Sequence, residues 1–301
     1  MRERKQTSSR PSRKPPKQTL RFQAIILLCI PLVIITLFVI WRQNDRPEYI
    51  PVIIQVEELP EDELQLTPVP RYLLTDTGYL KLVNRLLPMS RPIDYSTIVY
   101  AWPTVAVRAT DIMVHETLLN ALSDLFAEAY GMRPFFVTSG YRCVARQHEI
   151  YENAIDRMYV MPPGHSEHNL GLAADILVTD VTMAQMSGTP EAIWLAQNAW
   201  RHGMILRYPY GATHITQVAY EPWHFRYVGR VHAWYITMND MVLEEYLEHL
   251  EELGGFTVEL GEKTYHIMYQ QPIGDNIYVP IYLQFIVSKS NRGGYIITAW
   301  E

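Results

Sequence analysis

The sequence predicts an α+β fold, and three observations lead to that class. First, its 301 residues are 48% hydrophobic and 19% charged, which is enough to bury a sizeable core in one large domain or two smaller ones. Second, helical and strand periodicities interleave without the regular alternation of a βαβ fold. Third, residues 256–301 contain short strand-like runs separated by turns. We therefore expect a mixed central part followed by a small β-rich extension.

The chain begins with a basic tail. Residues 1–21 hold eight arginine or lysine side chains and one glutamate, a surplus of seven positive charges. Because the whole chain has a net charge of −6, the remaining residues carry a surplus of 13 negative charges. An acidic body does not suit a nucleic-acid surface, so we expect no nucleic-acid partner.

A long apolar segment follows the basic tail. In residues 24–41 only Thr36 is clearly polar, and as a helix this segment would span about 27 Å, close to the hydrocarbon thickness of a bilayer. A secretory signal peptide is the alternative, but it requires a shorter apolar core and a small-residue cleavage site. We expect residues 22–41 to be a single transmembrane helix in the cell membrane. The positive-inside rule then places the N-terminus in the cytoplasm and the rest of the chain outside the cell.

The chain after this helix divides into three parts. Residues 42–70 are rich in proline and acidic residues and predict a stalk or linker with one short strand. Residues 71–253 hold every motif discussed below. Near their end, Asn239 or Asp240 is expected to cap a helix that stops at a pair of glycines. Residues 256–301 form the extension, which is marginal as an independent domain because it is short and has no disulfide.

The central part contains two predicted helices with a strand between them. Residues 116–130 place apolar side chains at helical spacing, and Gly131 ends the pattern. A strand follows at Phe135 to Val137 and leads into a turn. Residues 145–158 predict the second helix, and the prolines at 162 and 163 prevent its continuation.

In the stretch GHSEHNLGLAADI, Gly171 lies between His168 and Asp175. Residues 172–177 alternate as a strand does, so residues seven apart on a continuous strand would face opposite ways. His168 and Asp175 can therefore meet only if the chain bends between them, and Gly171 permits a bend. Ala173 leaves space beside the carboxylate. An ordinary hydrogen-bonded pair is the commoner explanation of such a stretch, and a third ligand would favour a metal site.

A candidate third ligand lies in YEPWHFRYVG. Pro222 keeps Glu221 out of helical geometry, and the residues after it alternate between aromatic side chains and His224, Arg226 and Val228. The aromatic face would pack into the core, so His224 would point into a cleft with Glu221 near the same opening. Two imidazoles and one carboxylate suit zinc and leave a position for water, from which Glu221 would take a proton. The alternative interpretations are a hydrogen-bonded core histidine for His224 and a surface acid for Glu221.

These motifs together resemble one known family. SEHNLGLAAD at 166–175, combined with EPWH at 221–224, is similar to the signature of the VanY-type D-alanyl-D-alanine carboxypeptidases of the M15 metallopeptidases. The likeness extends to SGYR at 139–142 and to HGMILRYP at 202–209, and it covers about residues 78–250. By this resemblance, the fold is the Hedgehog/DD-peptidase type of α+β fold.

The resemblance also implies an activity and a role for each site residue. It implies one zinc ion and the release of the terminal D-alanine from peptidoglycan stem peptides or lipid-linked wall precursors outside the cell. Arg142 would bind either the oxyanion or the terminal carboxylate of the substrate. An L,D-carboxypeptidase, an endopeptidase and a non-catalytic, zinc-stabilised wall-binding module are the alternatives. The implied residues are the zinc ligands His168, Asp175 and His224, the catalytic residues Glu221 and Arg142, and the substrate-binding residues Gln147, Ser166, Tyr141 and Ser139.

Overall fold

The computed structural model of the chain describes residues 64–89 and 93–301. The predicted basic tail, the predicted transmembrane helix and most of the predicted linker lie outside the described residues. The features below all belong to one compact unit, Pro51–Glu301. Within the described part, no helix is long and apolar enough to cross a bilayer.

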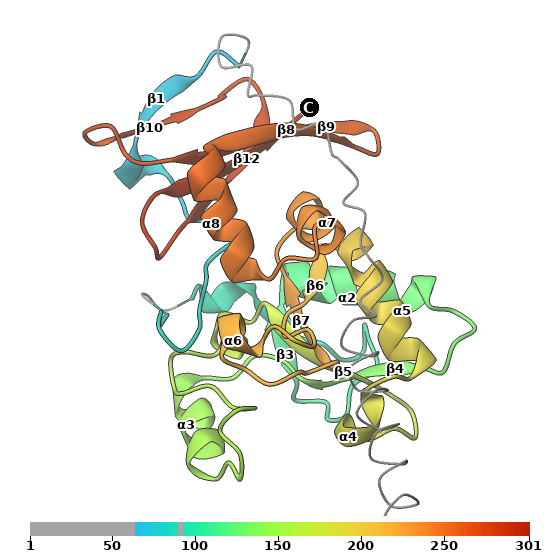
Figure 1. The fold of residues 1–301 in the computed structure, drawn as a ribbon. Helices are drawn as coiled ribbons and strands as arrows, with labels where there is room; N and C mark the ends of the chain where they lie inside the picture. The colour runs from blue at the N-terminus through green and yellow to red at the C-terminus, as the bar shows by residue number, and fades with distance from the viewer. Residues whose placement is uncertain (1–63, 90–92) are drawn as a thin grey trace, which may run out of the picture. The chain divides into compact units, whose positions relative to one another are not determined.

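The first four-stranded sheet is antiparallel, with strand order β4-β5-β7-β6. Helices α2 (Glu116–Glu128) and α5 (Pro190–Asn198) run beside it (Figure 1). Leucines of both helices share one buried cluster with Ile176 of β5 and Phe225 of β7. Helices packed on an antiparallel sheet confirm the α+β class. The strands are β4 (Phe135–Ser139), β5 (Ala173–Val178), β6 (Met204–Leu206) and β7 (His224–Tyr227).

Several short elements surround this sheet. A two-stranded sheet, β2 with β3, leads directly into α2. Short helices and 3₁₀ turns connect the longer elements. The two strands are β2 (Ile98–Tyr100) and β3 (Met113–His115), and the short helices and turns are α4 (Met183–Met186), α6 (Thr213–Thr216), η2 (Tyr95–Thr97), η3 (Glu167–Leu170) and η4 (Ala199–His202). A further turn, η1 (Arg71–Leu73), contacts Asp275 in the C-terminal part instead.

Helix α3 is shorter than the sequence predicts. It spans Val144–Glu152, whereas the pattern predicts a helix over 145–158. Asn153 ends the helix, and its side chain donates a hydrogen bond of 2.7 Å to the carbonyl of Glu149. Gln147 is the one buried residue of α3, so no apolar face holds a longer helix against the core.

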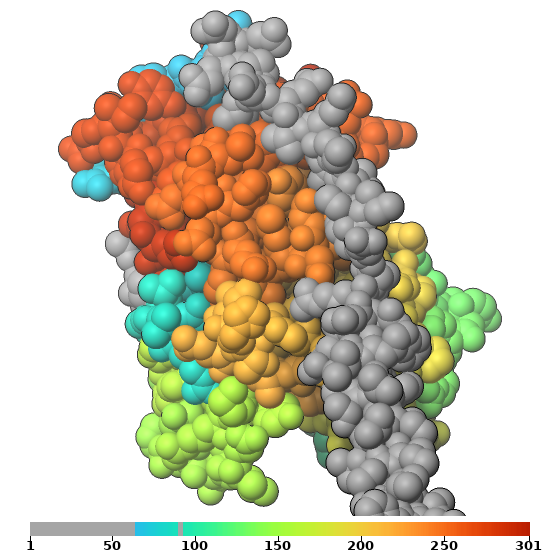
Figure 2. All heavy atoms as spheres, in the orientation of Figure 1, coloured from blue at the N-terminus to red at the C-terminus, as the bar shows by residue number. Residues whose placement is uncertain are grey.

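A second four-stranded antiparallel sheet, with order β11-β12-β9-β8, forms the C-terminal part. β10 (Asn276–Val279) pairs instead with β1 (Thr67–Pro70), which lies at the end of the predicted linker. In the space-filling view, blue atoms of the first described residues lie next to red atoms of the C-terminal part (Figure 2). The sequence pattern predicts β9 and β12, and it predicts β10 and β11 as one continuous run; it does not predict β8 or β1. The four strands are β8 (Gly255–Leu260), β9 (Lys263–Gln270), β11 (Gln284–Lys289) and β12 (Tyr295–Trp300).

Two helices connect the sheets through a common core. α7 (Arg230–Met238) and α8 (Leu243–Leu253) contribute to a buried cluster that contains Phe256 and Ile267 of the second sheet. The same cluster contains Ile205 of β6 in the first sheet. The β-rich extension therefore packs on the central part through this shared cluster, and it also has a second buried cluster that includes Ile277, Val287 and Ile297.

The start of α8 differs from the prediction. Its N-cap is Val242, whose backbone N–H donates to the Glu245 side chain (2.9 Å), and not Asn239 or Asp240. Asn239 instead ends α7, with its side chain donating to the carbonyl of Tyr235 (2.8 Å). Asp240 has a left-handed backbone, with φ of 49°, and turns the chain between the two helices. The sequence pattern does not predict α7, because β-branched and aromatic residues give it a weak intrinsic helix propensity.

Candidate metal centre

His168, Asp175 and His224 converge at the first sheet. Asp175 on β5 and His224 on β7 are direct cross-strand partners. His168 lies on the 3₁₀ turn η3, and Gly171, immediately after η3, has a left-handed backbone with φ of 70° that turns the chain into β5. A Cβ atom at Gly171 would lie 2.5 Å from the end of the Ile98 side chain, so a larger residue here would also require Ile98 to shift. The bend expected from the sequence is present, and it brings His168 to Asp175.

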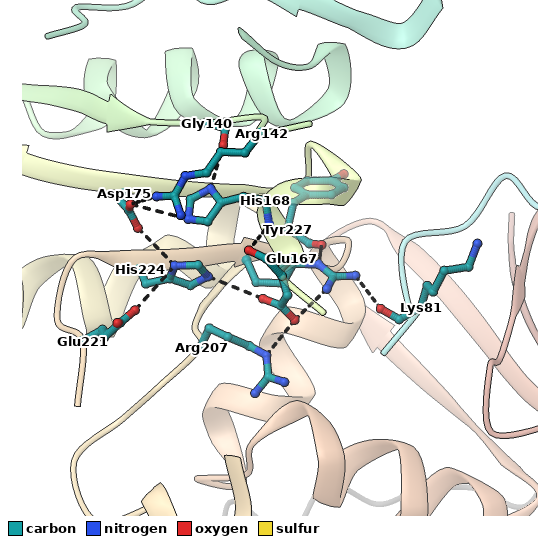
Figure 3. Close-up of polar contacts among 12 residues, drawn as sticks. Lys81, Gly140, Arg142, Glu167, His168, Asp175, Arg207, Glu221, His224 and Tyr227 are labelled. Carbon is teal, nitrogen blue, oxygen red and sulfur yellow. Dashed lines mark hydrogen bonds and ion pairs between the residues drawn. The ribbon is translucent and has the colours of Figure 1, made fainter. Parts of the chain in front are cut away.

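The three side chains have the geometry of a ligand set. One candidate ligand atom from each residue lies within 4.8 Å of the other two. His168 Nε2 lies 3.5 Å from Asp175 Oδ2, and His224 Nδ1 lies 3.1 Å from Asp175 Oδ1 (Figure 3). His168 Nδ1 is hydrogen-bonded to the carbonyl of Gly140 (2.7 Å), which leaves Nε2 available to a metal. Two imidazole nitrogens and one carboxylate oxygen suit zinc and leave a fourth position open.

The charges around this set also fit a cation. Burial lowers the pKa of His168 to about 4, and the positive charge of Arg142 acts in the same direction. Burial alone would lower the pKa of His224, but its hydrogen bond to Asp175 and the nearby carboxylate of Glu167 outweigh this effect and raise the pKa to about 9. At Asp175, burial acts to raise the pKa, but the two histidines hold it well below its usual value. A carboxylate that draws a proton onto its neighbour would attract a metal ion to the same place.

Glu221 is buried beside the ligand set without belonging to it. Its Oε2 lies 3.7 Å from His224 Nδ1, and its side chain lines the same cavity as the three candidate ligands. Burial is the main reason that its pKa rises to about 8, although the neighbouring His224 acts to lower it. A carboxyl group that titrates near neutrality and is not needed as a ligand can accept and return a proton.

Arg142 is fixed next to Asp175. Its Nη2 donates to Asp175 Oδ2 (3.1 Å; Figure 3). Its Nε and Nη2 also donate to Ser139 Oγ (2.9 and 2.7 Å). Gln147 accepts a hydrogen bond from Arg142 Nη1 (3.3 Å) and donates one to the carbonyl of Met161 (2.7 Å). These contacts hold the guanidinium group in one position beside the ligand set.

A cavity of about 590 Å³ opens onto these residues. Arg142, Gln147 and Ser166 line it, whereas Ser139 and Tyr141 are not among its lining residues. Ser139 supports Arg142, and the ring of Tyr141 contacts that of Tyr95, outside the cavity lining, with 6.1 Å between ring centroids. Much of the remaining wall is apolar, and it includes Ile150, Tyr159, Val160, Met161, Met183 and Trp223.

The sequence does not reveal a buried charge network next to the ligands. Glu167 Oε1 accepts hydrogen bonds from Arg207 Nε (2.8 Å) and Arg226 Nη1 (2.7 Å), and Arg207 also makes two hydrogen bonds to Glu244. Burial acts to raise the pKa of Glu167, but the two arginines hold it well below its usual value. Arg207 stands in HGMILRYP and Arg226 in the alternating strand. Neither position reveals a partner, because Glu167 is 40 and 59 residues away in the sequence.

Comparisons with known proteins find relatives over the part of the chain that holds this site. A family model described as VanY, D-alanyl-D-alanine carboxypeptidase, matches residues 111–230, a range that contains all nine predicted site residues. The D-alanyl-D-alanine carboxypeptidase of Enterococcus faecium is 35% identical over 195 residues, which are 64% of this chain and 63% of that relative. The bifunctional D-Ala-D-Ala dipeptidase and D-Ala-D-Ala carboxypeptidase VanXYC of Enterococcus gallinarum is 34% identical over 128 residues, 38% of this chain and 67% of the relative. This chain thus spans less than two thirds of the length of the E. faecium relative.

One solved structure shares the fold over a longer range. The crystal structure of the vancomycin resistance D,D-dipeptidase VanXYg, in complex with a D-Ala-D-Ala phosphinate analog, matches with a TM-score of 0.66 and 25% sequence identity. The match covers 83% of this chain and 100% of that chain. The likeness in fold therefore extends well beyond the residues that the family model matches.

Proposed function

Because the chain belongs to the family of VanY-type D-alanyl-D-alanine carboxypeptidases, we propose that it is a zinc-dependent carboxypeptidase that removes the terminal D-alanine from peptidoglycan stem peptides. The observation that carries the proposal is Glu221, a buried carboxylate beside a complete set of three ligands. A purely structural zinc site has four protein ligands and needs no additional acid. The names of both curated relatives support D-alanyl-D-alanine chemistry.

Glu221 is the proton carrier in this proposal. When bound by the three ligands, zinc supplies Lewis acidity toward the last peptide carbonyl and toward water. Glu221 takes a proton from the attacking water and returns it to the departing amine of D-alanine. Burial raises the pKa of Glu221 to about 8, and a divalent cation nearby favours the ionised carboxylate, so Glu221 is ready to accept a proton in the loaded site.

Arg142 stabilises the oxyanion. Its Nη2 lies 3.1 Å from an oxygen of Asp175, so the guanidinium group is adjacent to the ligand set and to the carbonyl that reacts there. Fixed donors aimed at developing negative charge lower the barrier because they need no reorganisation during the reaction. The terminal carboxylate of the substrate is then left for Ser166, whose side chain lines the cavity.

The cavity favours a stem peptide over a free dipeptide. Among the described residues that line it, the carboxylates are Asp175 and Glu221, which are both engaged at the reacting centre. The described part of the cavity wall therefore holds no further acid to pair with the free amine of D-alanyl-D-alanine. The apolar wall, formed in part by Tyr159, Met161 and Trp223, suits the methyl and methylene groups of a longer peptide.

We also propose that residues 22–41 anchor the enzyme in the cell membrane with the catalytic part outside the cell. The support is the apolar run that follows a basic tail. This location gives the site access to lipid-linked wall precursors and to stem peptides of the wall.

The test is an assay of the full-length chain, reconstituted in lipid nanodiscs, on a pentapeptide stem that ends in D-Ala-D-Ala. We expect release of D-alanine, loss of the activity with a chelator, and recovery when zinc is added back. A tetrapeptide stem and a cross-linked stem peptide serve as parallel substrates. Release of D-alanine from the tetrapeptide would favour an L,D-carboxypeptidase, internal cleavage would favour an endopeptidase, and zinc binding without hydrolysis would favour a non-catalytic module.

A further inference from the structure

Glu167 has one engaged carboxylate oxygen and one unengaged oxygen. Oε1 accepts hydrogen bonds from both Arg207 and Arg226, at 2.8 and 2.7 Å. Oε2 is buried and has no hydrogen-bond partner among the described residues. The atom that faces it is His224 Nε2, at 3.5 Å (Figure 3). That nitrogen is also buried and lacks a hydrogen-bond partner in the described part of the chain.

The contact between Glu167 Oε2 and His224 Nε2 determines which ring nitrogen of His224 is available to a metal. His224 Nδ1 lies against Asp175, on the side of the ligand set, and Nε2 lies against Glu167. A neutral imidazole that offers its lone pair at Nδ1 carries its proton at Nε2. A carboxylate that accepts this proton in a hydrogen bond selects the tautomer and holds the plane of the ring.

We propose that Glu167 is the positioning residue of His224, selecting the form that binds the metal through Nδ1. The proposal rests on the proposed function only in treating the site as a metal centre. His168 is held the other way round, since its Nδ1 is hydrogen-bonded to the carbonyl of Gly140 and its Nε2 faces Asp175. The two histidines therefore bind the metal through different ring nitrogens.

The use of the two carboxylate oxygens separates this role from that of an ordinary ion pair. A carboxylate placed only to neutralise two arginines would be expected to offer one oxygen to each. Here both arginines bond to Oε1, and Oε2 is left facing His224. An unpaired buried oxygen is costly, so a donor is expected at this position, and the Nε2 proton of His224 supplies one.

The arginines make Glu167 a rigid support. Arg207 donates to both oxygens of Glu244, at 2.8 and 2.6 Å, in the first turn of α8. Arg226 donates to the backbone carbonyls of Tyr79 (2.7 Å) and Lys81 (2.9 Å). Both guanidinium groups are fully buried, and two carboxylates balance their charges. Through the two arginines, Glu167 is thus connected to α8 and to the backbone at Tyr79 and Lys81.

The first test uses the wild-type protein. The full-length chain, labelled with ¹⁵N at its histidines and loaded with ¹¹³Cd in nanodiscs, is examined by long-range ¹H–¹⁵N correlation. We expect one metal-bound histidine coordinated through Nδ1 with a proton on Nε2, and one coordinated through Nε2 with a proton on Nδ1. Two metal-bound histidines of the same tautomer would overturn the proposal. This measurement does not depend on any variant folding or on hydrolysis.

The second test compares two carboxylate substitutions. The matched control for Glu167→Gln is Glu191→Gln. Glu191 lies on α5, accepts hydrogen bonds from Arg133, and contacts none of the candidate ligands. We expect Glu167→Gln to weaken zinc binding, measured by competition with a chelator, by about 10- to 100-fold. The Glu191→Gln variant should bind zinc as the wild type does. A folded Glu167→Gln protein with wild-type zinc affinity would refute the positioning role. If the wild-type protein showed no peptidase activity, by contrast, only the proposed function would be refuted.

Discussion

The two four-stranded sheets bury polar side chains in different ways. Around the first sheet the buried groups carry charge, including Asp175 on β5, Arg226 on β7 and Glu167 just before β5. On the described strands of the second sheet no buried residue is charged, and its polar groups are neutral partners such as Thr257 and His266 (2.9 Å). Burying charge is expensive unless opposite charges or a metal compensate for it. The comparison indicates that the chemistry lies in the first sheet, while the second stabilises the fold.

The two regions nevertheless share a boundary. Glu244, at the start of α8, binds Arg207 of the charge network. Leu247 and Leu250 of the same helix belong to the core that contains strands of the second sheet. If the comparison is correct, substitutions in the first sheet should change catalysis, and substitutions in the second sheet should change stability alone.

The largest effect is expected for Glu221→Gln. The amide has nearly the same shape but cannot take a proton from water, so kcat for D-alanine release should fall by about 10²- to 10⁴-fold. Zinc affinity should stay close to that of the wild type, because Glu221 lies outside the ligand set. Steady-state kinetics together with chelator competition check both statements. A variant that loses zinc in proportion to its activity would show that Glu221 is a ligand and would undo the assignment of roles.

The next effect is expected for Arg142→Lys. Lysine keeps the charge but cannot reproduce the fork of hydrogen bonds to Ser139, Gln147 and Asp175. For an oxyanion donor we expect kcat to fall by about 10²- to 10³-fold with little change in KM. Arg146→Lys, on the exposed surface of α3, is the matched control and should be silent. A raised KM with an unchanged kcat would instead assign Arg142 to the terminal carboxylate.

The sequence predicts the features of the first sheet that depend on short stretches. Alternating residues predict β5 and β7, and Gly171 allows the bend that brings His168 to Asp175. His224 follows from the alternation in its own strand. The bend that brings His168 to Asp175 is therefore predictable, because it depends only on neighbours in the sequence. That His224 joins them, from 49 residues away on a neighbouring strand, is implied by the family resemblance and not by a local pattern.

Features that depend on distant partners are not predictable in this way. A sequence pattern marks Glu167 and Arg226 as ordinary polar residues, and only the fold shows that they are buried against each other. The missed helix α7 and the shorter α3 have the same origin. Tertiary packing supports α7 in spite of weak propensity, and a lack of buried contacts ends α3 at Glu152.

In the second sheet, Ile297→Ala should affect stability alone. Ile297 is fully buried on β12, in a cluster separate from the core that α7 and α8 share. Truncation leaves a cavity and should lower the free energy of unfolding by about 2–5 kcal/mol. Ile297→Val should cost about 0.5–1.5 kcal/mol. Urea unfolding gives these values, and kcat and zinc affinity of the folded protein should be unchanged. A change in zinc affinity would show that the second sheet also shapes the metal site.

The smallest effect concerns pH and His232. This buried histidine of α7 is hydrogen-bonded to Tyr246 (2.6 Å) and to Thr298 of β12 (2.8 Å), and burial lowers its pKa to about 3. Unfolding returns the pKa to about 6.5, so the unfolded chain binds a proton that the folded chain does not, at any pH between these values. The contribution of His232 to stability is therefore complete above pH of about 6.5 and is lost progressively as the pH falls toward 3.

Comparison with His232→Gln isolates this contribution from that of the metal site, which titrates in the same range. Glutamine can keep one of the two hydrogen bonds but has no proton to gain. From pH 7 to pH 5, the wild type should lose about 2 kcal/mol more free energy of unfolding than the variant. Urea unfolding of both proteins at the two pH values provides the measurement. Equal losses would mean that His232 is not buried in its neutral form. The neutral hydrogen bond that joins α7 to Thr298 of the second sheet would then not be needed for stability, and the contrast between neutral and charged buried groups would be weakened.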